Sequence, residues 1–206
     1  MKGLSLTEPM VKAWLEGRKS VTRRLMNPQP DIASDGCIYY PHRDHPKWRR
    51  YENDKHFRRN VADDFPPRYL PGETVYIKET WSQSVTYIGD LIVGYKADGQ
   101  ARTSILNGPV RWMTLDDNKP LRQWNWKSPR FMPEWASRGH ALIGTVGPER
   151  VQEITEAAAI MEGFLFAGHG DDWKRHDSFR VAWDTLHPGS WEANSWVWRI
   201  ELEKLW

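Results

Sequence analysis

The spacing of apolar residues predicts three short helices in the chain. They cover residues 7–17, 155–163 and 178–186, where apolar side chains recur at intervals of three and four. The first two begin at a threonine and end at a glycine, which are typical residues for a helix start and a helix end. The expected buried stripes are Met10, Ala13 and Trp14 in the first helix, and Phe179, Ala182, Trp183 and Leu186 in the third.

Strands are predicted where β-branched and aromatic residues gather or alternate with polar ones. The predicted strands are residues 18–25 (a turn leading into a strand), 73–81, 91–96, 141–151 and 196–202. The fourth is expected to be interrupted at Gly144, Gly147 and Pro148, and the last to bury Trp196, Trp198, Ile200 and Leu202. Residues 108–122 are ambiguous, and residues 124–137 are expected to form a structured loop. Strands and uneven loops together predict an α+β chain, and they favour a small barrel over a doubly wound parallel sheet.

The length of 206 residues favours a single domain spanning residues 1–206. Residues 27–67 are punctuated by prolines and rich in basic side chains, so we expect an insertion or a long surface loop there. Residues 1–59 hold 13 Lys and Arg against 7 Asp and Glu, whereas the rest of the chain is slightly acidic. This basic first part indicates an anionic partner.

The composition also bounds the class of protein. No apolar run approaches the roughly 18 residues of a membrane span, and the start lacks the apolar stretch of a secretory signal. One cysteine excludes an internal disulfide framework, and a cytoplasmic location is expected. The 13 tryptophans are unusual, since some must fill the core and others could form a surface on which bases stack.

The densest candidate for chemistry is the segment 17–24, in which four cations and two hydroxyls follow a glycine. One interpretation is an anion or nucleotide site, with Thr22 as a nucleophile and Lys19 as its base. The other is a solvated basic strand edge. Residues three apart on a regular strand point to opposite faces, so Lys19 and Thr22 converge only if a turn or bulge lies between them.

Two glutamates stand in unusual places. Glu79 lies inside an apolar strand, so it is either half-buried and paired with Arg23, Arg24 or Arg130, or an ordinary solvent-facing residue. Glu162 lies just before the glycine that ends a predicted helix, where an acid opposes the helix dipole. Either a function explains it or it is a surface residue in a poor position.

An aromatic and basic segment is a further candidate. Arg130, Trp135 and Arg138, with Trp124 and Trp126 nearby, could form a platform for stacking and phosphate binding, or a tryptophan-rich core covered by arginines. Cys37, His42, His45 and His56 match the spacing of no common zinc finger, so no metal is expected.

Five separate motifs resemble the ASCH domain proteins of the PUA-like superfamily, in the long form found in phages and prophages. The motifs are EGRKSVTRR at residues 16–24, PGETVYIKETW at 71–81, RFMPEWASR at 130–138, ITEAA at 154–158 and NSWVW at 194–198. The resemblance implies a PUA-like small β-barrel with flanking short helices, here with the long basic insertion. Residues 31–66 and 99–122 are not matched.

The family motif G-x-K-x-x-E-x-R reads here as Gly17, Lys19, Thr22 and Arg24, with threonine in place of glutamate. The small bacterial N4-acetylcytidine amidohydrolases are similar in having that threonine. The resemblance implies a catalytic lysine, threonine and glutamate, which carry over to Lys19, Thr22 and Glu162. It implies amide hydrolysis by side chains, with no metal and no cofactor.

The implied partners are a nucleoside or RNA, with DNA as an alternative, and no membrane. The residues expected to contact substrate or nucleic acid are Arg23, Arg24, Glu79, Trp81, Arg130, Trp135 and Arg138. Two alternatives stay open. The protein could be a non-catalytic module that binds RNA or a modified base, or a ribonuclease that uses the same basic cleft.

Overall fold

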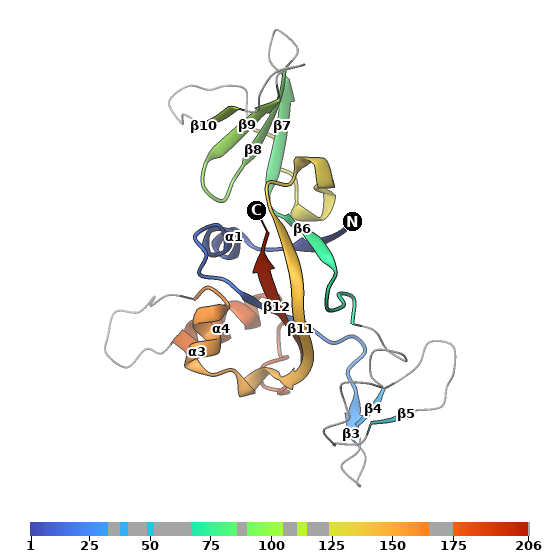
Figure 1. The fold of residues 1–206 in the computed structure, drawn as a ribbon. Helices are drawn as coiled ribbons and strands as arrows, with labels where there is room; N and C mark the ends of the chain where they lie inside the picture. Colours follow the sequence, from blue (N-terminus) through green and yellow to red (C-terminus); the bar gives the residue numbers. More distant parts are fainter. Residues whose placement is uncertain are drawn as a thin grey trace. The chain divides into compact units, whose positions relative to one another are not determined.

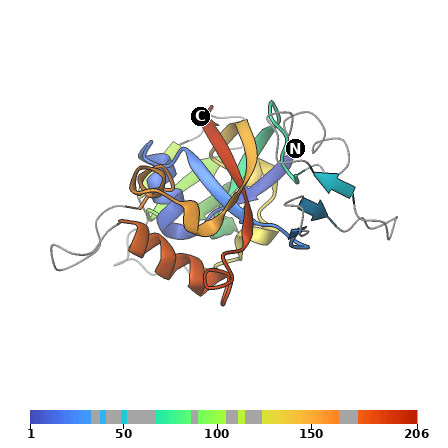
Figure 2. The ribbon, with the colours of Figure 1, turned by 90° about the horizontal axis from the view of Figure 1, so that it is seen from below.

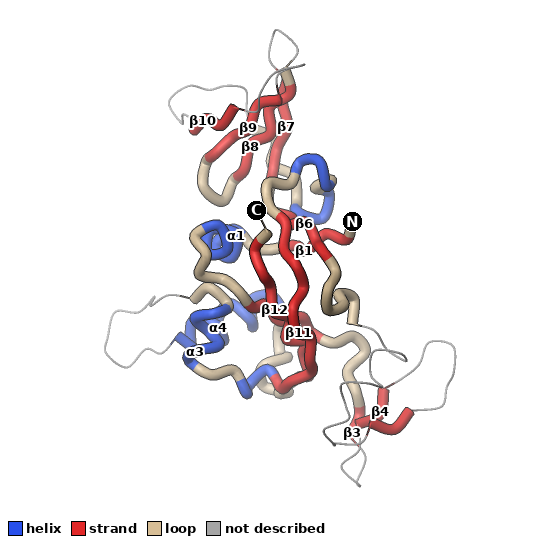
Figure 3. Tube along the Cα trace, viewed as in Figure 1, coloured by secondary structure: helices blue, strands red, loops and turns tan. Residues whose placement is uncertain are grey.

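The computed structural model describes residues 1–32, 38–40, 49–51, 67–85, 90–104, 111–114, 124–164 and 175–205, with mixed sheets and short helices (Figures 1 and 3). The strands are β1 (Lys2–Ser5), β2 (Val21–Leu25), β3 (Asp31–Ile32), β4 (Ile38–Tyr40), β5 (Arg49–Tyr51), β6 (Thr74–Lys78), β7 (Trp81–Val85), β8 (Leu91–Tyr95), β9 (Gln100–Ser104), β10 (Arg111–Thr114), β11 (His140–Arg150) and β12 (Trp196–Lys204). The helices are α1 (Glu8–Leu15), α3 (Glu156–Met161) and α4 (Arg175–Leu186), with 3₁₀ turns η1 (Pro129–Phe131), η2 (Glu134–Ala136) and η3 (Val151–Glu153). The α+β prediction is confirmed.

The chain divides into two compact units, and neither is continuous in sequence. Unit 1 comprises Met1–Lys19, Thr74–Leu142 and Lys204–Trp206, and unit 2 comprises Ser20–Glu73 and Ile143–Glu203. β11 begins in unit 1 and ends in unit 2.

Unit 1 contains β1, which pairs in parallel with β6 and places Leu4 beside Ile77, both fully buried. β6 pairs antiparallel with the start of β11. β7, β8, β9 and β10 form an antiparallel sheet in the order β10-β9-β8-β7, the green strands of Figure 1. The sequence pattern did not predict β1, β7 or β9, since none of these short strands has a long apolar alternation.

Helix α1 starts after Thr7 and is followed by Gly17 in the left-handed region, as predicted. Its buried residues are Val11, Ala13 and Trp14, so Val11 rather than the predicted Met10 completes the apolar stripe. In the same stripe, the Trp14 ring packs closely on Gly139, where an added Cβ would be 2.1 Å from it.

The predicted strand 73–81 is broken in the structure. β6 ends at Lys78 and β7 begins at Trp81, and between them the Glu79 backbone N–H donates to Met132 Sδ at 3.3 Å. After this break, Trp81 is buried in a hydrophobic core of unit 1. The other members of this core are Val93, Tyr95, Met132 and Ala136.

Unit 2 holds β2 at the edge of β12, in antiparallel register. Thr22 lies opposite Ile200, Arg23 opposite Arg199, and Arg24 opposite Trp198. The strand order there is β11-β12-β2. α3 contacts both β2 and α4, the orange-red helix of Figure 2. Thr155 caps α3 by accepting a hydrogen bond from the Ala158 N–H at 3.1 Å, as the sequence predicts.

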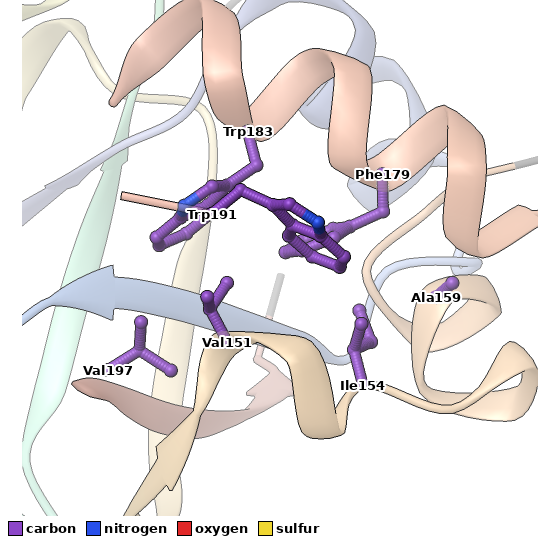
Figure 4. Close-up of a cluster of buried hydrophobic side chains, with 7 residues drawn as sticks. All are labelled: Val151, Ile154, Ala159, Phe179, Trp183, Trp191 and Val197. Carbon is purple, nitrogen blue, oxygen red and sulfur yellow. The ribbon is translucent and has the colours of Figure 1, made fainter. Parts of the chain in front are cut away.

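The core of unit 2 lies between α3, α4 and the strands. In Figure 4, the rings of Phe179, Trp183 and Trp191 face Val151 and Ile154. Phe179 and Trp183 stack with centroids 5.6 Å apart. Leu25 of β2 packs against this cluster.

Three details of the sequence prediction are wrong. β11 continues through Gly144, Gly147 and Pro148 without interruption. A Cβ built on Gly144 would lie 3.2 Å from Glu201 Cβ. The glycine therefore allows β12 to approach closely and does not break the strand. Leu186, expected in the buried stripe, is 49% exposed at the last residue of α4. Val197, expected on the polar face of its strand, is fully buried beneath the unit 2 core.

The described strands leave each sheet with two different edge strands, so no closed barrel is present in this part of the chain. β3, β4 and β5 form a small antiparallel sheet inside the predicted insertion 27–67. The other residues of 33–66 lie outside the described ranges, so the insertion stays a prediction. Across the described ranges, every helix is too short or too polar to cross a membrane.

Candidate functional site

Four polar side chains of the predicted site are almost fully buried. The exposed fractions are 3% for Lys19, 1% for Thr22, 2% for Arg23 and 1% for Glu162. The interpretation of these residues as a solvated strand edge or a surface glutamate is therefore wrong. Buried polar groups are costly unless they are bonded, so the burial of each of these side chains needs an explanation.

The backbone around Ser20 fixes the start of β2. The Ser20 N–H donates to the Met161 carbonyl at 2.8 Å, and the Ser20 carbonyl accepts from the Leu202 N–H at 2.8 Å. The hydrogen-bonded residues are Ser20 and Met161. Each is the chain neighbour of a predicted site residue, because Ser20 follows Lys19 and Met161 precedes Glu162. Lys19 itself lies before β2, where the alternation of a strand does not govern the direction of its side chain.

Arg23 joins two glutamates inside unit 2. Its Nη1 donates to Glu162 Oε1 at 3.0 Å, and its Nε donates to Glu149 Oε1. The guanidinium also lies 5.7 Å from the centroid of the Phe179 ring. Two carboxylates around one guanidinium hold Arg23 in place, so it acts on Glu162 as a positioning residue.

Glu162 follows the last residue of α3, and its own N–H donates to the Ala158 carbonyl at 3.0 Å. The ion pair with Arg23 offsets the unfavourable end of the helix dipole. Glu149 was not a candidate from sequence. It lies in a strand of mixed polarity, and no spacing or motif distinguishes it from a solvent-facing acid.

Thr22 is the second residue of β2, and its side chain is buried. Within the described residues, its Oγ1 has no hydrogen-bond partner. A buried hydroxyl left without a partner costs about 1–3 kcal/mol. Groups of this kind are rare, and a ligand or a catalytic role is one reason for their presence.

Arg24 is half-buried and donates from Nη1 to the Arg23 carbonyl at 3.1 Å. Burial lowers the pKa of Arg24, Tyr69 and Glu162 oppose this, and Arg68 adds a smaller lowering. Burial, and then the charge of Arg24, also lower the pKa of His187. Arg24 thus lies near both acidic and basic groups, and its contact with an anion stays a prediction.

Unit 1 holds a second ionic cluster. Glu79 is buried, and its partner is Arg138 rather than the predicted Arg23, Arg24 or Arg130. Arg138 also donates to Asp98, which sequence reasoning missed. Burial raises the pKa of the Glu79 carboxyl, and the hydrogen bonds from Arg138 oppose that rise. Burial also raises the pKa of Tyr95 to about 12.

The aromatic segment is part core and part surface. Trp81 is buried, and Trp135 is exposed and meets it edge-on with centroids 5.9 Å apart. Arg130 is exposed, whereas the Arg138 side chain is bound by two acids and nearly buried. Glu79, Trp81 and Arg138 are therefore largely buried, unlike the exposed Arg130 and Trp135. A direct contact of these three residues with a ligand stays a prediction.

Cys37, His42, His45 and His56 lie outside the described residues. Within the described part of the chain, no three His, Cys, Asp or Glu side chains gather to hold a metal ion. Comparison with known proteins finds no matching family model, no similar curated protein and no similar solved structure.

Proposed function

We propose that this chain is an ASCH protein with a PUA-like fold, and that it hydrolyses the acetyl amide of N4-acetylcytidine-type substrates. Its reaction centre would be Thr22 and Glu162 of unit 2, with Lys19 as the base that the resemblance implies. The observation that carries the proposal is the buried Thr22 hydroxyl, which has no partner among the described residues and lies on the strand of a buried Arg23–Glu162 pair.

In this proposal, Thr22 Oγ1 attacks the acetyl carbonyl carbon while Lys19 accepts the hydroxyl proton. The C–N bond then breaks, and the proton passes to the departing amine nitrogen of cytidine. Water releases acetate from the acetyl ester on Thr22. The sum is N4-acetylcytidine plus water giving cytidine plus acetate. The burial of the cluster strengthens each of these polar interactions, because bulk water is kept away.

Glu162 orients the amide nitrogen or donates the proton that it needs to leave. Arg23 holds Glu162 at 3.0 Å and so fixes the angle of that carboxylate. Arg24 supplies positive charge for the developing oxyanion or for a substrate phosphate.

The test is incubation of the purified protein with N4-acetylcytidine, with cytidine release followed by chromatography. We expect release by the wild type, and a loss of at least about 100-fold in Thr22→Val and Glu162→Gln. Thr185→Val on the exposed face of α4 is the matched control and should keep full activity. An inactive wild type that is folded, or an active Thr22→Val, would overturn the hydrolase.

A second function rests on the same buried hydroxyl, since an unpartnered donor and acceptor can also hold a base without chemistry. It predicts that N4-acetylcytidine binds to the protein, as measured by calorimetry, and that Thr22→Val weakens binding without any turnover in the wild type.

A further inference from the structure

Two large aromatic side chains of unit 1 lie in water close to one another in the sequence. Phe131 is 70% exposed and Trp135 is 51% exposed. They belong to the successive 3₁₀ turns η1 and η2. Exposed Trp and Phe side chains in one short segment are uncommon on a protein that has no partner there.

The backbone that carries these rings is held firmly. Met132 and Ala136, between and after them, are buried in the unit 1 core with Trp81. The Trp135 carbonyl accepts a hydrogen bond from Arg102 Nη2 at 2.6 Å, and the Arg130 carbonyl accepts one from Lys78 Nζ at 2.6 Å. A ring that is already fixed loses little conformational entropy when a ligand stacks on it.

The charges around the rings are positive. Lys127 Nζ lies 4.9 Å from the Trp81 ring, and Arg130 is exposed. Neither forms an ion pair within the described residues. The neighbouring acid Glu134 is neutralised by the amino group of Met1 at 3.0 Å. Glu134 is thus paired, while Lys127, which lies over the Trp81 ring, and Arg130, which precedes Phe131 in η1, have no ion-pair partner among the described residues.

We propose that Lys127, Arg130, Phe131 and Trp135 form a binding surface for single-stranded nucleic acid, here called the stacking surface. Bases would stack on the exposed rings, and phosphates would contact the two cations. A folded protein partner fits less well, because a flat ring beside an unpaired cation matches the alternation of base and phosphate along a strand. This inference goes beyond the proposed hydrolysis, since the stacking surface lies wholly in unit 1 and needs no turnover.

The test is fluorescence anisotropy with a labelled 15-nucleotide oligouridylate, repeated with oligothymidylate and with a duplex of the same length. We expect binding of the single strands over the duplex, with an affinity that falls as salt rises. Trp135→Ala and Phe131→Ala should each weaken binding about tenfold. Arg130→Gln should reduce the slope of log affinity against log salt by about 0.7, the value for one phosphate on a single strand.

Trp135 packs on Trp81, so its variant could lose structure as well as a binding ring. The Arg130 side chain makes no contact of this kind, so Arg130→Gln tests the surface without that ambiguity. Lys12→Gln on exposed α1 is the charge-matched control, and Val85→Ala on β7 is the apolar one. Equal binding by Arg130→Gln and Lys12→Gln, or no binding by the wild type at 50 mM salt, would overturn the proposal. The experiment measures binding of a strand that carries no acetyl group. A negative result would therefore contradict the stacking surface without contradicting the proposed hydrolase.

Discussion

Arg138 holds both carboxylate oxygens of Glu79, with its Nε and Nη2 each 2.8 Å from one oxygen. Its third nitrogen, Nη1, donates to Asp98 at 2.7 Å, and its guanidinium lies 4.2 Å from the centroid of the Tyr95 ring. All three nitrogens of the guanidinium are therefore bonded inside unit 1, and an aromatic ring lies against it. This bond network ties the break after β6 to the loop between β8 and β9.

Arg138→Met should destabilise the fold by about 3–5 kcal/mol, because it leaves the buried Glu79 carboxylate without its partner. The double variant with Glu79→Met should recover much of that loss, since no charge is then buried. The free energy of unfolding in urea measures both. Arg180→Met, which breaks an exposed ion pair with Glu192, is the control and should cost less than about 1 kcal/mol. Equal losses at Arg138 and Arg180 would show that the buried network contributes nothing.

Thr22→Val should make the protein more stable by about 1 kcal/mol, because it replaces a buried hydroxyl that has no partner with a methyl group of similar size. The midpoint of thermal unfolding should then rise by about 2–4 °C. A gain in stability together with a loss of turnover would identify Thr22 as a residue kept for function. A large loss of stability would instead mean that a partner satisfies the hydroxyl.

Gly139→Ala should destabilise the protein by about 1–3 kcal/mol, since the new Cβ would meet the buried ring of Trp14 at 2.1 Å. Gly147→Ala is the control, because a Cβ on this glycine of β11 would enter open space. Thermal unfolding compares the two. If both variants melt at the wild-type temperature, the packing of Trp14 on Gly139 is not what holds α1 in place.

His187 should make stability depend on pH. Burial and Arg24 lower the pKa of His187 below its ordinary value of 6.5, so the unfolded chain takes up a proton before the folded protein does. Stability from this group is complete above pH 6.5 and is lost as the pH falls through the folded pKa. Urea unfolding at pH 7.5 and pH 5.5 should show a smaller difference for His187→Gln than for the wild type. An unchanged difference would rule out this role.

The sequence predicted those helices and strands whose signals lie within one short segment of the chain. α1 and α3 have their threonine starts and glycine ends within one short segment, and β8 is a compact run of apolar residues, so all three were found close to their observed bounds. The break at Glu79 was not predictable. The Glu79 N–H there donates to the Met132 sulfur more than fifty residues away, and the composition of residues 73–81 is that of an unbroken strand.

The candidate site divides in the same way. Lys19, Thr22 and Glu162 were selected by a motif, and each is buried, but the motif says nothing of what surrounds them. Glu149 and Asp98 complete the two buried arginine networks, and each is an unremarkable acid in its own stretch of sequence. Pairings of this kind follow from the folded arrangement of distant strands and loops, which periodicity cannot supply.

The interleaving of the two units has a consequence for synthesis on the ribosome. Residues 1–19 belong to unit 1, yet β1 must wait for β6, and β2 must wait for β12, which is made about 170 residues later. The Leu205 N–H donates to the His140 carbonyl, so unit 1 also includes a residue that is made after β12. Neither unit can be completed before β12 has been made, and the apolar faces of β1, α1 and β2 must stay protected from aggregation until then.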